Sequence, residues 1–147
     1  MTDSLTILES ARKKYSADIL ETETKSGKRA TVTIKPSSLV NMAGYLFRDL
    51  NLRFIIATAL HTKQGMEIYY HFSHDPSGLI FNLHVILPEE KPEIESLTCM
   101  FEAANWIERE MHEILGINFL NHPNLEKLIS EGNWAEGVYP YRKEFNH

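Results

Sequence analysis

Three strand-like segments follow one another in the middle of the chain. They cover residues 54–60, 66–72 and 79–87, and each is rich in apolar side chains of the types that favour strands. The last two are separated by Asp75-Pro76-Ser77-Gly78, whose residue types suit a tight turn. The sequence therefore predicts an antiparallel pair of strands over residues 66–72 and 79–87.

The segments before these strands alternate between helical and extended patterns. Apolar residues recur at helical spacing over residues 4–15, where Thr6 and Glu9 have the form of a capping box. Threonines mixed with valine and isoleucine around Ser26-Gly27-Lys28 predict a β-hairpin over residues 18–35. A second helix is expected to start near Pro36, with an apolar stripe of Leu39, Met42, Leu46 and Leu50.

A short strand and a third helix are expected after the acidic loop between Pro88 and Pro92. Residues 96–100 have the composition of the strand. The helix carries the run Asn-Trp-Ile-Glu-Arg-Glu-Met-His-Glu-Ile-Leu-Gly over residues 105–116, which we call the signature segment. Gly116 suits its C-terminal cap, and the buried stripe is predicted to be Ala103, Ile107, Met111 and Ile114.

These elements predict an α+β fold in the order α-β-β-α-β-β-β-β-α. We expect a two-layer core domain over residues 1–116, with a mixed, largely antiparallel sheet packed on helices. Residues 117–147 show little periodicity, yet they contain Phe119, Trp134, Tyr139, Tyr141 and Phe145. This composition predicts an irregular aromatic tail that packs either on its own domain or on a partner subunit.

Length and composition restrict the class of protein. A chain of 147 residues with 43% hydrophobic residues fits one domain with a buried core. Its net charge of -5 disfavours nucleic acid or anionic lipid as the main partner. Cys99 is the only cysteine, so the chain cannot supply the several thiolates of an iron–sulfur cluster. We expect a cytoplasmic chain, because the first residues lack a secretory pattern and no apolar run is long enough to span a bilayer.

Residues 112–122 offer a candidate zinc site. His112 and Glu113 begin like the His-Glu-x-x-His helix of zinc proteases, and His122 lies where the third ligand of the longer motif would be. Gly116 replaces the second histidine, however, and Phe119 replaces the required turn glycine. A freestanding zinc hydrolase is therefore a minor alternative.

The other candidate reactive residues favour structural roles. His71 and His74 would point to opposite faces of a strand, so a metal set with His84 is not favoured. The spacing of four residues lets Arg109 meet Glu113 and Glu108 meet His112, which predicts a solvated ion-pair face. Cys99 lies in an apolar run and is expected to be a core residue rather than a nucleophile.

The signature segment and the residues after it resemble a known family. The ordered combination resembles the 30-kilodalton subunit of respiratory complex I and the homologous subunit of membrane-bound energy-converting [NiFe] hydrogenases. The family pattern usually has an aromatic residue and an aspartate where this chain has His112 and Glu113. The residues that carry the resemblance are expected to form a partner interface; they are Trp106, Glu108, Arg109, Glu110, Gly116, His122, Pro123, Trp134, Tyr139, Pro140, Arg142 and Lys143.

The resemblance implies a peripheral subunit without catalytic, cofactor or metal residues of its own. It would contact a large catalytic subunit and a small [4Fe-4S] subunit, which would hold the clusters and, in a hydrogenase, the NiFe centre. It would be attached indirectly to membrane subunits on the cytoplasmic side of the cell membrane. Residues 133–143 look more like the hydrogenase branch, so an ion-translocating hydrogenase is expected first. A complex I-like oxidoreductase with NADH, quinone or another donor is the alternative, and a soluble interaction module outside any redox complex is a third reading.

Overall fold

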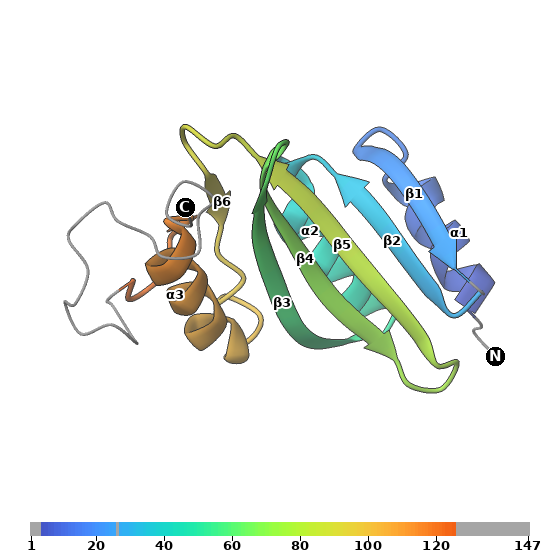
Figure 1. Cartoon of the computed structure of the whole chain (residues 1–147). Coiled ribbons are helices and arrows are strands. Elements are labelled where there is room, and N and C mark those ends of the chain that lie inside the picture. The colour runs from blue at the N-terminus through green and yellow to red at the C-terminus, as the bar shows by residue number, and fades with distance from the viewer. Residues whose placement is uncertain (1–3, 26, 126–147) are drawn as a thin grey trace. The chain divides into compact units, whose positions relative to one another are not determined.

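A computed structural model of the chain describes residues 4–25 and 27–125. These residues form two compact units, which are described separately. The first contains residues up to 57 together with residues 69–85, and the second contains residues 58–68 and the chain from residue 86 onward. Figure 1 shows the elements in the predicted order, so the α+β fold class is confirmed.

Five strands form one mixed sheet with the order β1-β2-β5-β4-β3. Strands β1 and β2 form the predicted antiparallel hairpin, whereas β2 pairs with β5 in parallel. The three predicted segments in the middle of the chain are strands; the first two are slightly longer than expected, and the third has the predicted bounds. The strands are β1 (Ile19–Lys25), β2 (Arg29–Ile34), β3 (Arg53–Thr62), β4 (Gly65–His74) and β5 (Leu79–Leu87).

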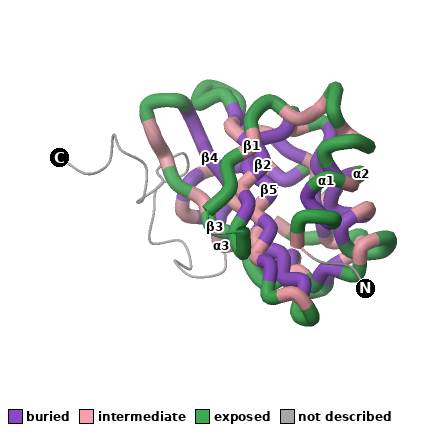
Figure 2. Tube along the Cα trace, turned by 90° about the vertical axis from the view of Figure 1, so that its right-hand side faces the viewer, coloured by how far each residue is buried: buried purple, intermediate pink, exposed green. Residues whose placement is uncertain are grey.

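The helices of the first unit lie on one face of its sheet, as Figures 1 and 2 show. Helix α1 (Ser4–Lys14) buries Ile7, Leu8 and Ala11, which lie on one side of the helix because of its 3.6-residue period. Helix α2 (Leu39–Gly44) follows a 3-10 turn over Pro36–Ser38 and continues as a π-helical turn over Tyr45–Asp49. Of its predicted stripe, Leu39, Met42 and Leu46 are fully buried, and Leu50 is partly exposed.

Alternate residues of the central strand β5 supply the core of this unit. Leu79, Phe81, Leu83 and Val85 are buried, as the two-residue period of a strand requires when one face is covered. The strand β1 at the edge of the sheet is exposed along most of its length, which Figure 2 shows in green. The alternation therefore places Asn82 and His84 on the opposite face of β5, between Ile80 and Ile86.

The second unit contains β6 (Glu93–Glu95), helix α3 (Ala103–Leu115) and β7 (Asn118–Leu120). The strand predicted at residues 96–100 is wrong, because pairing stops at Glu95 and the chain then turns. Strand β7 was not predicted, and it pairs with β6 in parallel. Gly116 ends α3 in the left-handed conformation with φ 78°, as its predicted role as the cap requires.

The predicted tail is described only at its beginning. Ile117 and Phe119 are buried, and residues 118–120 form β7. Its signature residues His122 and Pro123 are described, whereas Trp134, Tyr139, Pro140, Arg142 and Lys143 lie outside the described residues. The division between a core and a docking tail at residue 116 therefore stays a prediction.

Candidate functional site

Helix α3 turns a glutamate, rather than an isoleucine, toward the interior of its unit. Ala104, Glu108, Met111 and Leu115 are buried and follow steps of four, three and four residues, and Glu113 is buried as well. The predicted stripe is wrong except at Met111, because Ala103 is exposed and Ile107 and Ile114 are only partly covered. A charged residue therefore occupies a core position of the signature segment.

Glu108 holds the connection between β6 and α3. Its carboxyl group is only 1% exposed, and its Oε1 accepts a hydrogen bond of 2.5 Å from Ser96 Oγ. Its Oε2 accepts a second bond of 2.8 Å from the backbone N–H of Leu97. The segment that follows β6 is thus tied to the middle of α3 by both carboxyl oxygens.

The hydroxyl of Ser96 also contacts a residue that lies nearer the surface. Ser96 Oγ accepts a bond of 3.0 Å from the backbone N–H of Thr98 and lies 2.8 Å from Thr98 Oγ1. Either hydroxyl can donate in the second contact. The carboxyl group of Glu108 is therefore linked to a partly exposed threonine through one buried serine.

His122 completes the cluster from the segment after β7. Its Nε2 lies 3.1 Å from the carbonyl oxygen of Asn105 and 4.0 Å from Glu108 Oε1, and its side chain is fully buried. Its Nδ1 accepts a bond of 2.9 Å from the backbone N–H of Asn124. These two bonds fit a neutral imidazole with its proton on Nε2. We call Glu108, Ser96, Thr98 and His122 the Glu108 cluster.

Burial changes the acidity of this glutamate. The pKa of Glu108 is raised from 4.5 to about 7, chiefly because burial removes water from the carboxyl group, with a smaller contribution from the negative charge of Glu95. The hydrogen bonds from Leu97 and Ser96 oppose this, because they favour the ionised form. The carboxyl group is therefore able to exchange a proton near neutral pH.

The predicted solvated ion-pair face is not formed, and the residues of the minor zinc-site alternative have other contacts. Glu108 and Glu113 are 1% and 3% exposed, so neither lies on a solvated face. His112 Nδ1 donates to the carbonyl oxygen of Ile117 at 2.9 Å rather than pairing with Glu108. Within residues 4–25 and 27–125, no group of three or more histidine, cysteine, aspartate or glutamate side chains is placed to hold a metal.

A shallow groove of about 480 Å³ lies beside the Glu108 cluster, within the second unit. Thr98 lines it together with Asn105 and Pro123. Cys99 also lines the groove and is exposed, so the prediction that it is a core residue is wrong. The reason is the turn at residues 98–100, which replaces the expected strand.

The remaining described signature residues lie at different depths. Trp106 is 58% exposed on α3, and Glu110 is partly exposed. Arg109 Nε is buried and has no hydrogen-bond partner among the residues that the structure describes. The signature segment thus combines a buried carboxyl group with an exposed aromatic ring on one helix.

A second polar cluster lies on the sheet of the first unit. Thr33 Oγ1 and His84 Nδ1 are 2.8 Å apart, and the ring of His84 stacks on that of Tyr69 with 4.2 Å between centroids. His71 Nδ1 donates to Asn82 Oδ1 at 2.7 Å. These side chains, with Thr31, come from β2, β4 and β5, and we call them the strand-face row.

The three candidate histidines are not brought together as a set. His71 and His84 belong to the strand-face row, whereas His74 Nδ1 contacts Ser77 Oγ at 2.7 Å in the following turn. The prediction that His71 and His74 point in different directions is consistent with these different partners. Their partners within the chain give each of the three a structural role.

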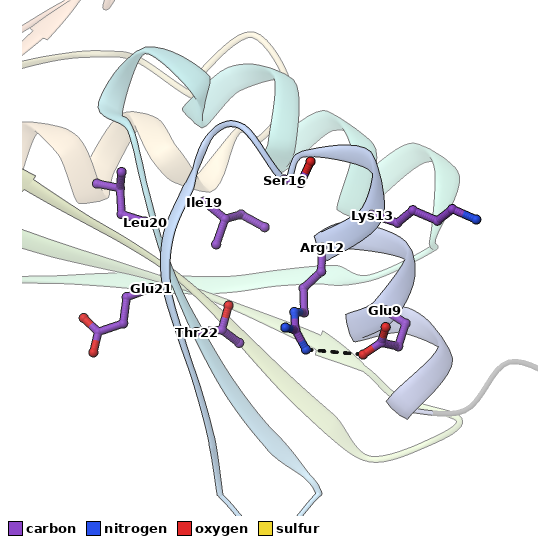
Figure 3. Close-up of a pocket in the computed structure, with 8 residues that line it drawn as sticks. All are labelled: Glu9, Arg12, Lys13, Ser16, Ile19, Leu20, Glu21 and Thr22. Carbon is purple, nitrogen blue, oxygen red and sulfur yellow. Dashed lines mark hydrogen bonds and ion pairs between the residues drawn. The ribbon is translucent and has the colours of Figure 1, made fainter.

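A larger groove of about 570 Å³ lies between α1 and β1. Figure 3 shows that α1 contributes Arg12 and Glu9, which are joined by an exposed ion pair of 3.3 Å. Leu20 and Thr22 line the groove from β1. Its lining shares no residue with the signature segment or the Glu108 cluster.

Comparison with known proteins identifies the family. Residues 32–147 match the family model described as the respiratory-chain NADH dehydrogenase 30 Kd subunit. The chain belongs to this family. The resemblance inferred from the signature residues is therefore confirmed, and the protein is a subunit of a complex I-like, multi-subunit respiratory oxidoreductase.

Individual relatives carry different enzyme names. A subunit of the F420H2 dehydrogenase of Methanosarcina mazei is 30% identical over 97% of this chain and 92% of the relative. A subunit of the NADH-quinone oxidoreductase of Geobacter metallireducens is 27% identical over 91% of this chain and 84% of the relative. A chain of the membrane-bound sulfane sulfur reductase, an archaeal respiratory membrane complex, shares the fold with a TM-score of 0.76. That match has 20% identity and covers 95% of this chain and 84% of the other.

In the described part of this chain, we find no helix with the length and hydropathy needed to cross a membrane.

The sequence did not reveal the roles of Ser96, which donates a hydrogen bond to the Glu108 carboxyl group, or of Thr98, which contacts Ser96. A usable signal was present on α3, because Ala104, Glu108, Met111 and Leu115 have helical spacing as regular as the predicted stripe. Glutamate is rarely buried without a partner, so the sequence alone does not favour a buried stripe that contains Glu108. The partners come from a turn whose position the sequence did not reveal.

Proposed function

We propose that this chain is a non-catalytic peripheral subunit that positions the large catalytic subunit beside the small, cluster-bearing subunit of a complex I-like oxidoreductase. One observation carries the proposal: the reactive groups of the signature region bind the chain's own backbone. Glu108 accepts from Leu97 N–H, His112 donates to Ile117 O, and His122 contacts Asn105 O. These groups support a surface instead of surrounding a substrate.

The lone cysteine supports the same assignment. An iron–sulfur cluster is held by several cysteine thiolates, and this sequence has only Cys99. The [4Fe-4S] clusters of the complex would therefore belong to partner subunits. Peripheral attachment on the cytoplasmic side of the membrane, through those subunits, is part of the proposal.

The exposed ring of Trp106 is the proposed contact with the large subunit. A tryptophan that is 58% exposed on a well-supported helix offers a large apolar area, and such residues often dominate the binding energy of interfaces. Leu20 on β1 is 62% exposed and provides a matched apolar control outside the signature region.

Affinity purification of a tagged full-length chain from its native membranes tests the proposal. The wild-type chain and Leu20→Ala should recover a large catalytic subunit and an iron–sulfur subunit in equal amounts. Trp106→Ala should lower recovery of the large subunit by about tenfold, corresponding to about 1.4 kcal/mol of binding energy. Recovery of the wild-type chain alone would refute the proposed role, and equal recovery with Trp106→Ala would refute the proposed contact.

The substrates of the complex separate two candidates. The names of the relatives described above support an oxidoreductase that uses NADH, F420H2 or another donor with quinone or another acceptor. The resemblance of residues 133–143 to the hydrogenase branch supports an ion-translocating hydrogenase with a NiFe centre in the large subunit. Nickel analysis of the purified complex distinguishes them: stoichiometric nickel with hydrogen-dependent electron transfer supports the hydrogenase, and its absence supports the first candidate.

A further inference from the structure

We propose that Glu108, Ser96 and Thr98 form a proton-binding site, in which a buried carboxyl group takes up a proton from the neighbouring groove through two hydroxyl groups. This inference goes beyond the role in assembly, because it concerns a group inside the chain. It requires a buried acceptor, a connected hydroxyl chain and an exit to solvent. All three lie within residues 95–124 of the second unit.

The buried acceptor lacks a cationic partner among the described residues that contact it. Glu108 is 1% exposed, and the nearby His122 has the hydrogen bonds of a neutral imidazole. Glu95 of β6 contributes a further negative charge, and it accepts a bond of 2.6 Å from Asn121. On α3 itself, His112 directs its Nδ1 to the carbonyl of Ile117. A carboxylate in this position favours binding of a proton.

The hydrogen bonds can be satisfied in both protonation states. When Glu108 is ionised, Thr98 Oγ1–H donates to Ser96 Oγ, and Ser96 Oγ–H donates to Glu108 Oε1. When Glu108 is protonated, its Oε1–H donates to Ser96 Oγ, and Ser96 Oγ–H donates to Thr98 Oγ1. In both states Ser96 Oγ accepts from Thr98 N–H, and Glu108 Oε2 accepts from Leu97 N–H. No backbone movement is needed to switch between them.

The hydroxyl groups of Thr98 and Ser96 also provide a route by which a proton can reach Glu108 with every proton accounted for. A hydronium ion in the groove gives a proton to Thr98 Oγ1, and the original hydroxyl proton of Thr98 moves to Ser96 Oγ. The original hydroxyl proton of Ser96 then moves to Glu108 Oε1. Each hydroxyl ends with one proton, the carboxylate becomes a carboxylic acid, and a water molecule remains in the groove. Thr98 lines the groove, so this series of hydroxyl groups reaches solvent.

Glutamine at position 108 is a suitable probe of the bound state. Its amide N–H can donate to Ser96 Oγ, and its carbonyl oxygen can accept from Leu97 N–H, so it reproduces the bonds of the protonated acid. Glu9→Gln is the matched control, because the Glu9 side chain is 72% exposed on α1. Thr98→Val removes the outer hydroxyl of the chain, and Thr24→Val on β1 is its control.

Infrared difference spectroscopy of the full-length chain between about pH 5 and about pH 9 tests the site. We expect a carboxylic-acid carbonyl band that titrates with a midpoint of about 7 and is absent in Glu108→Gln but present in Glu9→Gln. Ser96→Ala removes a bond that favours the ionised form, so the midpoint should rise by about one pH unit. In Thr98→Val, exchange of this band in deuterated water should be about tenfold slower than in Thr24→Val.

These measurements use the full-length chain alone, so they test the proton-binding site independently of the proposed contacts with partner subunits. No titrating acid band in the wild-type chain, or a band that persists in a folded Glu108→Gln variant, would overturn the site. If Glu108→Gln does not fold, the midpoint in Ser96→Ala decides: an upward shift supports the site, and an unchanged or lower midpoint overturns it. Equal exchange rates in Thr98→Val and Thr24→Val would overturn the hydroxyl route.

Discussion

The Glu108 cluster and the strand-face row both combine histidine with hydroxyl groups, but only the first buries a carboxyl group. In the strand-face row, His84 contacts Thr33 and stacks on Tyr69. In the Glu108 cluster, one carboxyl group instead receives donors from Ser96 and Leu97. Similar side chains therefore give the two clusters different properties, because only the Glu108 carboxyl group can carry a buried negative charge.

Removal of the Glu108 carboxyl group is expected to give the largest change in the free energy of unfolding. Glu108→Ala leaves the N–H of Leu97 without its acceptor at a cost of about 2 kcal/mol, and the cavity left by the buried side chain costs about 2 kcal/mol more. We therefore expect the free energy of unfolding to fall by about 4 kcal/mol at pH 5, where the wild-type carboxyl is protonated. Urea unfolding of the full chain measures this. A loss of under about 1 kcal/mol would show that the cluster is no more costly to disrupt than the strand-face row.

The second effect is a pH dependence that the strand-face row does not provide. Because the native pKa of Glu108 is raised from 4.5 to about 7, this group adds stability below pH 4.5 that is lost as the pH rises through about 7. The wild-type chain should lose about 3 kcal/mol over this range relative to Glu108→Gln, which does not titrate. Urea unfolding at several pH values measures the difference, and a difference that stays constant with pH would contradict it.

A smaller effect is expected in the strand-face row. Thr33→Val keeps the size of the side chain and removes the hydroxyl that contacts His84 Nδ1. The free energy of unfolding should fall by about 1 kcal/mol, the typical net value of one neutral hydrogen bond. Thermal and urea unfolding would check this. A loss as large as that of Glu108→Ala would remove the distinction between the two regions.

The smallest effect is expected at the surface. Glu9→Ala removes the ion pair with Arg12, in which both side chains are more than half exposed. Such pairs contribute little, so the free energy of unfolding should change by less than about 0.5 kcal/mol. Urea unfolding at low and high salt should give nearly the same small value, and a large salt-sensitive loss would show that this pair is part of a wider network.

The sequence predicted the fold well where periodicity and turn residues agree. Thr31 and Val32 in the hairpin, and Gly78 in the turn before β5, lie where the pattern placed them. The same reasoning failed at residues 96–100, where an apolar composition suggested a strand. There the backbone instead turns toward Glu108, a contact over eleven residues that no local pattern encodes.

The candidate site was predicted in part. The signature residues identified the family, but the inward position of Glu108 was not recognised. Two helical stripes on α3 share Met111, and the choice between them depends on Ser96 and Leu97, which lie outside the helix. Tertiary contacts therefore decided which face of this helix is buried.

Hydrogen exchange at the Leu97 amide, followed by NMR, tests most directly whether Glu108 holds the segment before α3. Leu97 N–H donates to Glu108 Oε2 at 2.8 Å, so its exchange should be slow in the wild-type chain and in Glu108→Gln, which keeps an acceptor. In Glu108→Ala the amide should exchange much faster, while amides inside α1 keep their wild-type rates. Rapid exchange of the Leu97 amide in the wild-type chain, or unchanged protection in Glu108→Ala, would contradict this role of Glu108.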